Sequence, residues 1–206
     1  MVEIQESNII QLPKTLEEFI EWEQPYDGFK YEWNDGEIVR FEGMKMRYLY
    51  IYHVLTNCFI EKGYVDKGVL ISKLEIVFSK LQVRKPDISY FTEEQVYQGR
   101  NDIDIIPEFT VEILSGEDKL IDVENKLIEY FKAGVKVAWH IIPAQEVVYI
   151  YTSRSEVKIC FDKDICSARQ VSSWDTTSCK RFAETGLQVV QEELRKRRLS
   201  ACSVVI

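Results

Sequence analysis

Residues 109–142 read FTVEILSGEDKLIDVENKLIEYFKAGVKVAWHII, and the expected fold follows from this stretch. Residues 109–114 are nearly all apolar, which is typical of a strand covered on both faces. In residues 118–133 the apolar side chains recur at helical spacing, and Gly134 is suited to end that helix. Residues 135–142 are again mostly apolar and predict a second strand. A strand, an amphipathic helix and a strand in succession indicate an α/β protein.

Further elements are expected on both sides of this stretch. Thr15 and Glu18 fit a capping box at the start of a helix, and Asn34-Asp35-Gly36 between aromatic and β-branched residues predicts a hairpin turn. The other predicted elements are a helix over 45–61 and strands over 69–78, 87–91, 147–151 and 157–161. Together they predict a central sheet with helices packed around it.

Composition and charge exclude two classes of protein. Of the 206 residues, 46% are hydrophobic and 29% are charged, so the chain has enough apolar surface to fold and is not disordered throughout. The net charge of -8 excludes a protein held to nucleic acid by bulk charge alone.

Composition changes after residue 161, where Ser, Thr, Asp and Cys dominate. We therefore expect an α/β domain over 1–161 and a divergent extension over 162–206, with a helix near 186–198.

Cysteine usage and hydropathy predict the compartment. The five cysteines are dispersed and contain no C-x-x-C pair, which favours free thiols in a reducing environment over a disulfide framework or a zinc site. The first ten residues lack the basic and apolar segments of a signal peptide, and no apolar run is long enough to span a membrane. These features predict a cytoplasmic protein with no membrane partner.

Two carboxylates are candidates for chemistry. Glu112 lies inside the apolar strand, where an ionised carboxylate is costly unless a cation or hydrogen-bond donors compensate it, and Asp87 opens the strand at 87–91. Each alone also fits a structural role, Glu112 in an ion pair and Asp87 in a turn. Successive strands of one sheet can bring the two together, and a divalent metal would then relieve their repulsion. Oxygen ligands favour Mg²⁺ or Mn²⁺ over Zn²⁺.

A lysine and a third carboxylate complete the candidate set. Lys126 lies at the edge of the apolar stripe of the predicted helix, where its stem can be buried while its ammonium reaches the sheet edge. Lys119, seven residues earlier, lies on the same edge and is an alternative. Glu37 directly follows the hairpin turn. Each of these residues also fits a solvated surface position.

The ordered set of motifs resembles a known family. The set comprises Tyr31-Glu32-x-x-Asp35-Gly36-Glu37, Lys85-Pro86-Asp87-Ile88, Val111-Glu112-Ile113-Leu114-Ser115, Lys126-x-x-x-Tyr130-x-x-x-Gly134-Val135 and Ala138-Trp139-x-Ile141-Ile142-Pro143. It is similar to the Uma-two type restriction endonuclease family, a branch of the PD-(D/E)XK nuclease superfamily. The resemblance covers roughly residues 15–161.

This resemblance implies a restriction-endonuclease-like core with a central mixed β-sheet, and a metal-dependent phosphodiesterase site. It implies Asp87 and Glu112 as catalytic metal ligands and Glu37 as an accessory ligand. The superfamily pattern places a lysine two residues after the glutamate, where this chain has Leu114. In the Uma-two family that role moves to the following helix, which indicates Lys126.

The expected function is Mg²⁺- or Mn²⁺-dependent endonuclease activity on DNA. In this reading Asp87, Glu112 and Glu37 hold the metal, and Lys126 stabilises the transition state. The alternative is a catalytically inactive nuclease fold that binds DNA or a protein. One site per chain has to cut two strands, so a homodimer is also expected.

Overall fold

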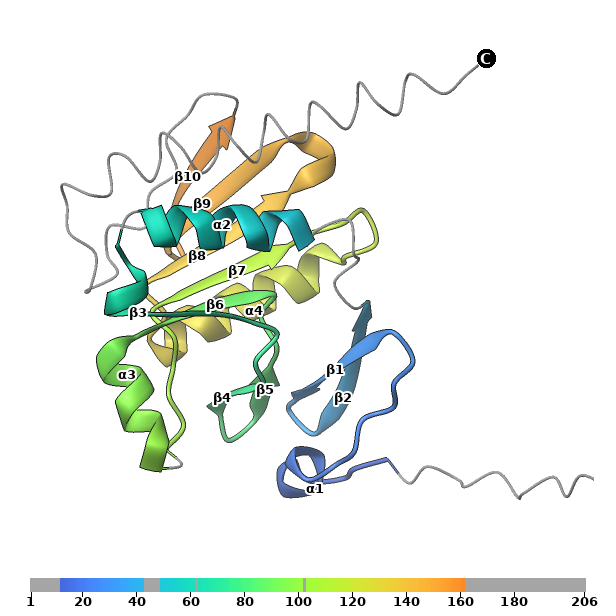
Figure 1. Cartoon of the computed structure of the whole chain (residues 1–206). Coiled ribbons are helices and arrows are strands. Elements are labelled where there is room, and N and C mark those ends of the chain that lie inside the picture. Colours follow the sequence, from blue (N-terminus) through green and yellow to red (C-terminus); the bar gives the residue numbers. More distant parts are fainter. Residues whose placement is uncertain (1–11, 43–48, 62, 102, 162–206) are drawn as a thin grey trace, which may run out of the picture.

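The computed structural model describes residues 12–42, 49–61, 63–101 and 103–161, and it contains two sheets (Figure 1). The larger sheet has six strands. Across the sheet they are β10 (Glu156–Phe161), β9 (Val147–Ser153), β8 (Val137–Ile142), β7 (Phe109–Ile113), β6 (Ile88–Thr92) and β3 (Gly68–Ser72). Strands β7 and β8 are parallel and the other neighbours are antiparallel, so the sheet is mixed.

Helices cover both faces of the larger sheet (Figure 1). Strand residues such as Val111 and Ile141 pack with the buried side of α2 (Leu49–Glu61) in the main core. Because side chains alternate between the faces of a strand, Glu112 points to the opposite face. There α4 (Leu120–Ala133) brings its buried Tyr130 to the Glu112 carboxylate. Gly134 ends α4 in the left-handed conformation, as expected. The predicted α/β fold with a mixed central sheet is confirmed.

The smaller sheet carries the predicted hairpin. Its order is β2 (Glu37–Glu42), β1 (Phe29–Asn34), β5 (Gln82–Arg84) and β4 (Ile76–Ser79). Asp35 and Gly36 both have positive φ, as the turn between two directly connected strands requires. One face of β1 is apolar and packs with Phe19 of α1 (Leu16–Ile20). The other face of β1 carries Lys30 and Glu32, and both are buried.

The structure differs from the sequence prediction in three places. The single strand predicted over 69–78 is wrong: Lys73, with φ 55°, breaks it, and its two halves enter different sheets as β3 and β4. Strand β5 was not predicted, nor was the short α3 (Glu93–Gln98), which Thr92 and Gln95 cap reciprocally. Three-residue 3₁₀ turns occur at Val65–Lys67, Gly99–Asn101 and Pro143–Gln145.

Two predictions lie partly or wholly outside the described residues. The helix predicted over 45–61 is described from residue 49 onward. The extension over 162–206, with its predicted helix at 186–198, is not described, and the domain boundary at 161 stays a prediction. Within the described residues, no helix is both long and apolar enough to cross a membrane.

Candidate active site

Asp87 and Glu112 meet at the edge of the larger sheet. Strands β6 and β7 pair with Ile88 opposite Val111, so Asp87 and Glu112 stand one step further along the same ladder. The Ile113 N–H donates to Asp87 Oδ2 at 2.8 Å, which joins the two strands at this point. Both carboxylates are more than nine-tenths buried. The sequence prediction that these two side chains lie together therefore agrees with the structure.

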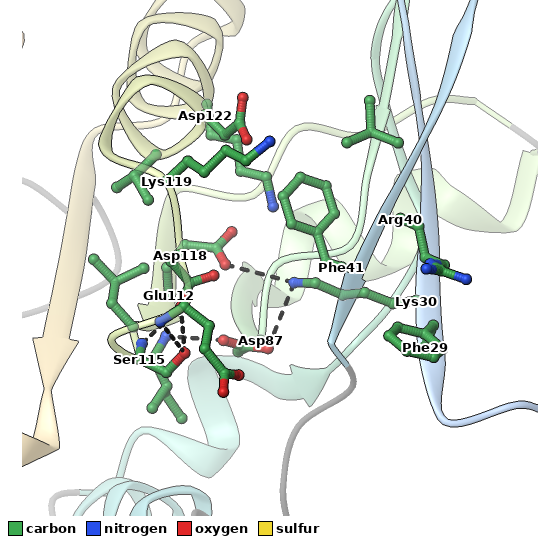
Figure 2. A pocket seen from close by; sticks show the side chains of 16 residues that line it. Phe29, Lys30, Arg40, Phe41, Asp87, Glu112, Ser115, Asp118, Lys119 and Asp122 are labelled. Atoms are coloured by element: carbon green, nitrogen blue, oxygen red, sulfur yellow. Dashed lines mark hydrogen bonds and ion pairs between the residues drawn. The ribbon is translucent and has the colours of Figure 1, made fainter.

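The Lys30 ammonium lies between the two carboxylates (Figure 2). Its Nζ is 3.7 Å from Asp87 Oδ1 and 3.7 Å from Glu112 Oε2. It also donates to the Lys85 carbonyl at 3.2 Å and is 3.6 Å from Glu32 Oε1. Burial alone would lower the pKa of Lys30, but the three carboxylates hold that pKa above its ordinary value. The ammonium thus stays charged inside the cluster.

Lys126 joins the same cluster from α4. Its ammonium donates to Glu32 at 3.0 Å and lies 3.8 Å from the centre of the Phe41 ring. The predicted position at the edge of the apolar stripe is what allows this reach, since Lys126 is only 5% exposed. The alternative, Lys119, is exposed and only lines the pocket mouth. The structure therefore selects Lys126 over Lys119 as the inner lysine.

Glu32 is the carboxylate that links the two buried lysines. It is fully buried, accepts from Lys126, and lies 3.5 Å from Arg84 Nη1. Arg84 in turn makes a bidentate pair with Glu129 at 2.7 and 2.8 Å. Burial acts to raise the pKa of Glu32, but the cations of Lys126, Lys30 and Arg84 prevail and hold it below its ordinary value. Glu32 is therefore an ionised partner that fixes the lysines in place.

A pocket of about 280 Å³ opens over this cluster (Figure 2). It lies between the hairpin, the β6–β7 edge and the start of α4. Its charged lining residues are Lys30, Arg40, Asp87, Glu112, Glu117, Asp118, Lys119, Asp122 and Lys126, and its aromatic lining residues are Phe29 and Phe41. The two predicted carboxylates and the predicted lysine thus share one solvent-accessible cavity.

The structure does not bring Glu37 to this pocket. Glu37 pairs with Asn34 beside the hairpin turn and is exposed, and it is not among the described residues that line the cavity. The carboxylate of the hairpin that enters the cluster is Glu32. The structure therefore does not place Glu37 with Asp87 and Glu112, because β1, rather than the residue after the turn, faces α4.

Comparisons with known proteins agree with this fold. The model of the Uma2 family, described as "Putative restriction endonuclease", matches residues 16–173. The chain belongs to the Uma2 family. A search of curated proteins finds no match. Among solved structures, the chain resembles a putative nuclease belonging to DUF820 from Anabaena variabilis, with a TM-score of 0.70 and 19% identity over 88% of this chain and 99% of that one. At this identity the likeness shows the fold.

In this Uma2 protein, two further side chains touch Glu112 or lie beside it. The Tyr130 hydroxyl donates a short hydrogen bond to Glu112 Oε1. Burial and the neighbouring Glu112 carboxylate raise the pKa of Tyr130 well above its ordinary value, so the hydroxyl stays a donor. His140 is opposite Glu112 on β8, is 3% exposed, and its Nε2 has no hydrogen-bond partner in the described structure. Ser115, by contrast, shapes the turn before α4 by donating to Asp118.

His140 makes the stability of this Uma2 protein depend on pH. Burial, opposed in part by Glu112, lowers the pKa of His140 from 6.5 to about 4. Between these values the unfolded chain binds a proton that the folded protein does not, so stability falls as the pH falls from 6.5 to 4. Over this window the loss is about 3 kcal/mol.

Replacing His140 by asparagine is expected to remove this contribution. Urea unfolding at pH 7 and at pH 4.5 measures it: the wild type should lose more stability between the two values than His140→Asn does. An equal loss in both proteins would contradict the buried, neutral state of this imidazole.

The donor set of the cluster fits a hard divalent cation. Within the described residues, no three His, Cys, Asp or Glu side chains are placed as a metal-binding group. Mg²⁺, however, commonly uses one or two carboxylates, keeps several waters and takes the rest of its shell from substrate phosphates. Asp87 and Glu112 already converge on one positive charge, and the Lys85 carbonyl faces the same point. Two carboxylates and a carbonyl oxygen suit Mg²⁺ or Mn²⁺.

Proposed function

We propose that this protein is a metal-dependent endonuclease that hydrolyses phosphodiester bonds in DNA with Mg²⁺ or Mn²⁺. The observation that supports this most is the convergence of Asp87 and Glu112 on a single cationic point, at the base of a pocket that Lys126 also lines. Membership of the Uma2 putative restriction endonuclease family supports the same reading. A structural ion pair alone would not need an open pocket above it.

The residues of the cluster would have distinct roles in this reaction. Asp87 and Glu112 would hold the metal, which supplies charge neutralisation at the phosphate and a more acidic water when it is bound. Lys126 would donate to a non-bridging phosphate oxygen and stabilise the charge that develops there. Glu32 keeps that ammonium in position, and Tyr130 keeps the Glu112 carboxylate oriented.

A second candidate function is a nuclease fold that binds DNA or a protein without cutting it. The observation that favours it is the balance of charges in the cluster. The carboxylates of Asp87, Glu112 and Glu32 already have cationic partners in Lys30 and Lys126, as expected of a purely structural ion-pair network. The two candidates differ in whether a divalent metal is bound and used.

The test is a cleavage assay with the full chain. Supercoiled plasmid and single-stranded DNA are incubated with Mg²⁺, with Mn²⁺ and with EDTA, and the products are resolved on gels. We expect nicking or linearisation with either metal and none with EDTA. DNA that stays intact with both metals, while the protein is folded and shifts DNA in a binding assay, would support the second candidate instead.

Two features of the cellular setting belong to the same proposal. The protein would act in the cytoplasm, because dispersed cysteines with no C-x-x-C pair suit a reducing compartment. It would work as a homodimer on duplex DNA, because each chain offers one site and two strands must be cut. Sedimentation with and without DNA measures that state.

A further inference from the structure

The position of Lys30 carries a consequence for metal binding. Its ammonium touches one oxygen of Asp87, one of Glu112 and the carbonyl of Lys85, at 3.7, 3.7 and 3.2 Å. These are the same oxygen donors that would bind a divalent cation. The ammonium and a divalent cation that both lay between these carboxylates would be only a few ångströms apart, and in a buried site they would repel each other strongly. A metal held by both carboxylates therefore requires the ammonium to move.

We propose that Lys30 is the built-in counter-cation of the Asp87–Glu112 pair and competes with the divalent metal for it. This inference rests on the proposed function and adds a residue that controls the affinity of the site for metal. In the metal-free protein the ammonium holds two buried carboxylates together that would otherwise repel each other. When the metal binds, the ammonium withdraws from between them and the carboxylates change partner.

The surroundings of Lys30 allow this exchange. Lys30 lines the pocket, whose volume of about 280 Å³ gives the ammonium space to leave the carboxylates. A lysine side chain is a point charge on a flexible four-carbon stem, so it can turn toward the cavity without moving β1. The aromatic ring of Phe41, which lines the pocket, already lies 5.5 Å from the ammonium, so one favourable contact on the cavity side is in place before the ammonium moves.

The other buried lysine does not have this role. Lys126 is bonded to Glu32 at 3.0 Å, and its contacts do not include Asp87 or Glu112 at ion-pair distance among the described residues. Lys119 lines the same pocket but is exposed at its mouth. Removing the charge of Lys119 therefore changes the electrostatic potential of the pocket but leaves the Lys30 ammonium between the carboxylates. Lys119→Met is thus a matched control for Lys30→Met.

The experiment measures metal affinity and does not depend on cleavage. Mn²⁺ binding to the full chain is followed by calorimetry and by the electron paramagnetic resonance of free Mn²⁺, at pH 8 so that the carboxylates are ionised. We expect Lys30→Met to bind Mn²⁺ about tenfold more tightly than the wild type, because a competing charge is gone. Lys119→Met is expected to stay within about twofold of the wild type, because salt screens an exposed charge.

A second variant keeps the test informative if Lys30→Met does not fold. Lys30→Arg retains the charge, and its guanidinium can bind a carboxylate through two hydrogen bonds, so we expect weaker Mn²⁺ binding than in the wild type. Opposite shifts for the methionine and arginine variants support the proposal. Wild-type affinity in the folded Lys30→Met variant, or equal tightening in Lys119→Met, overturns it.

Failure of this inference is distinct from failure of the proposed function. A wild type that binds Mn²⁺ and cuts DNA, with Lys30→Met unchanged in affinity, overturns only the role of Lys30. A wild type that does not cut DNA, with Lys30→Met binding Mn²⁺ more tightly, supports the role of Lys30 and contradicts the nuclease proposal. An absence of Mn²⁺ binding in both proteins overturns both.

Discussion

Replacing Glu112 by glutamine is expected to reduce Mg²⁺-dependent DNA cleavage by about a thousandfold or more, because the proposed metal site then loses one of its two carboxylates. Glutamine has nearly the same shape and its amide oxygen can still accept from Tyr130, so the local hydrogen bond is retained. The measured quantities are the initial rate of plasmid nicking and the affinity for Mn²⁺. The nicking rate and the Mn²⁺ affinity should fall together, since the proposal assigns the same carboxylate to metal binding and to cleavage.

Glu37→Gln is the matched control for this variant. It makes the same chemical change in the hairpin, but Glu37 is exposed and lies outside the pocket. We expect Glu37→Gln to cleave DNA at the wild-type rate. Thermal unfolding of both variants shows whether the fold is intact. A folded Glu112→Gln protein that cuts as fast as the wild type would remove Glu112 from the site.

The meeting of Asp87 and Glu112 could be predicted from the sequence. Glu112 lies inside one apolar strand and Asp87 at the start of another, and a charge buried in such a strand requires a partner. The position of Lys126 could also be predicted, because helical spacing places it beside the buried stripe of α4. For Lys126 the signal is local, because a period of 3.6 residues shows which side chains of a helix face the interior.

The roles of Glu32 and Lys30 were missed although a signal for them exists. Tyr31 and Trp33 are apolar and alternate with Lys30 and Glu32, so strand periodicity places the two charges on one face. What sequence alone does not give is that this face packs against α4 rather than solvent. That depends on the smaller sheet, which forms because Lys73 ends β3 and redirects the chain into β4. Pairing between strands that are distant in the sequence therefore decides whether Lys30 and Glu32 are buried against α4.

Removing the Glu32 carboxylate is expected to produce the largest loss of stability. Glu32 is fully buried and is the shared partner of Lys126, Arg84 and Lys30. Lys30 keeps Asp87 and Glu112, and Arg84 keeps Glu129, but Glu32→Gln removes the carboxylate that pairs with the buried Lys126 ammonium. Breaking a buried ion pair in this way costs about 3–5 kcal/mol. Urea unfolding at pH 7 measures the change. The same substitution at exposed Glu37 should shift the free energy of unfolding by no more than about 0.5 kcal/mol.

A double variant separates this loss from simple loss of packing. If the cost in Glu32→Gln is the uncompensated Lys126 ammonium, then adding Lys126→Met removes that charge and should restore part of the stability. The double variant should unfold at a higher urea concentration than Glu32→Gln alone, although it carries one more substitution. If instead the two losses add, Glu32 acts as a shape-filling side chain and the lysines are neutralised elsewhere. Whether the urea midpoint of the double variant lies above or below that of Glu32→Gln therefore decides whether charge compensation holds the hairpin against α4.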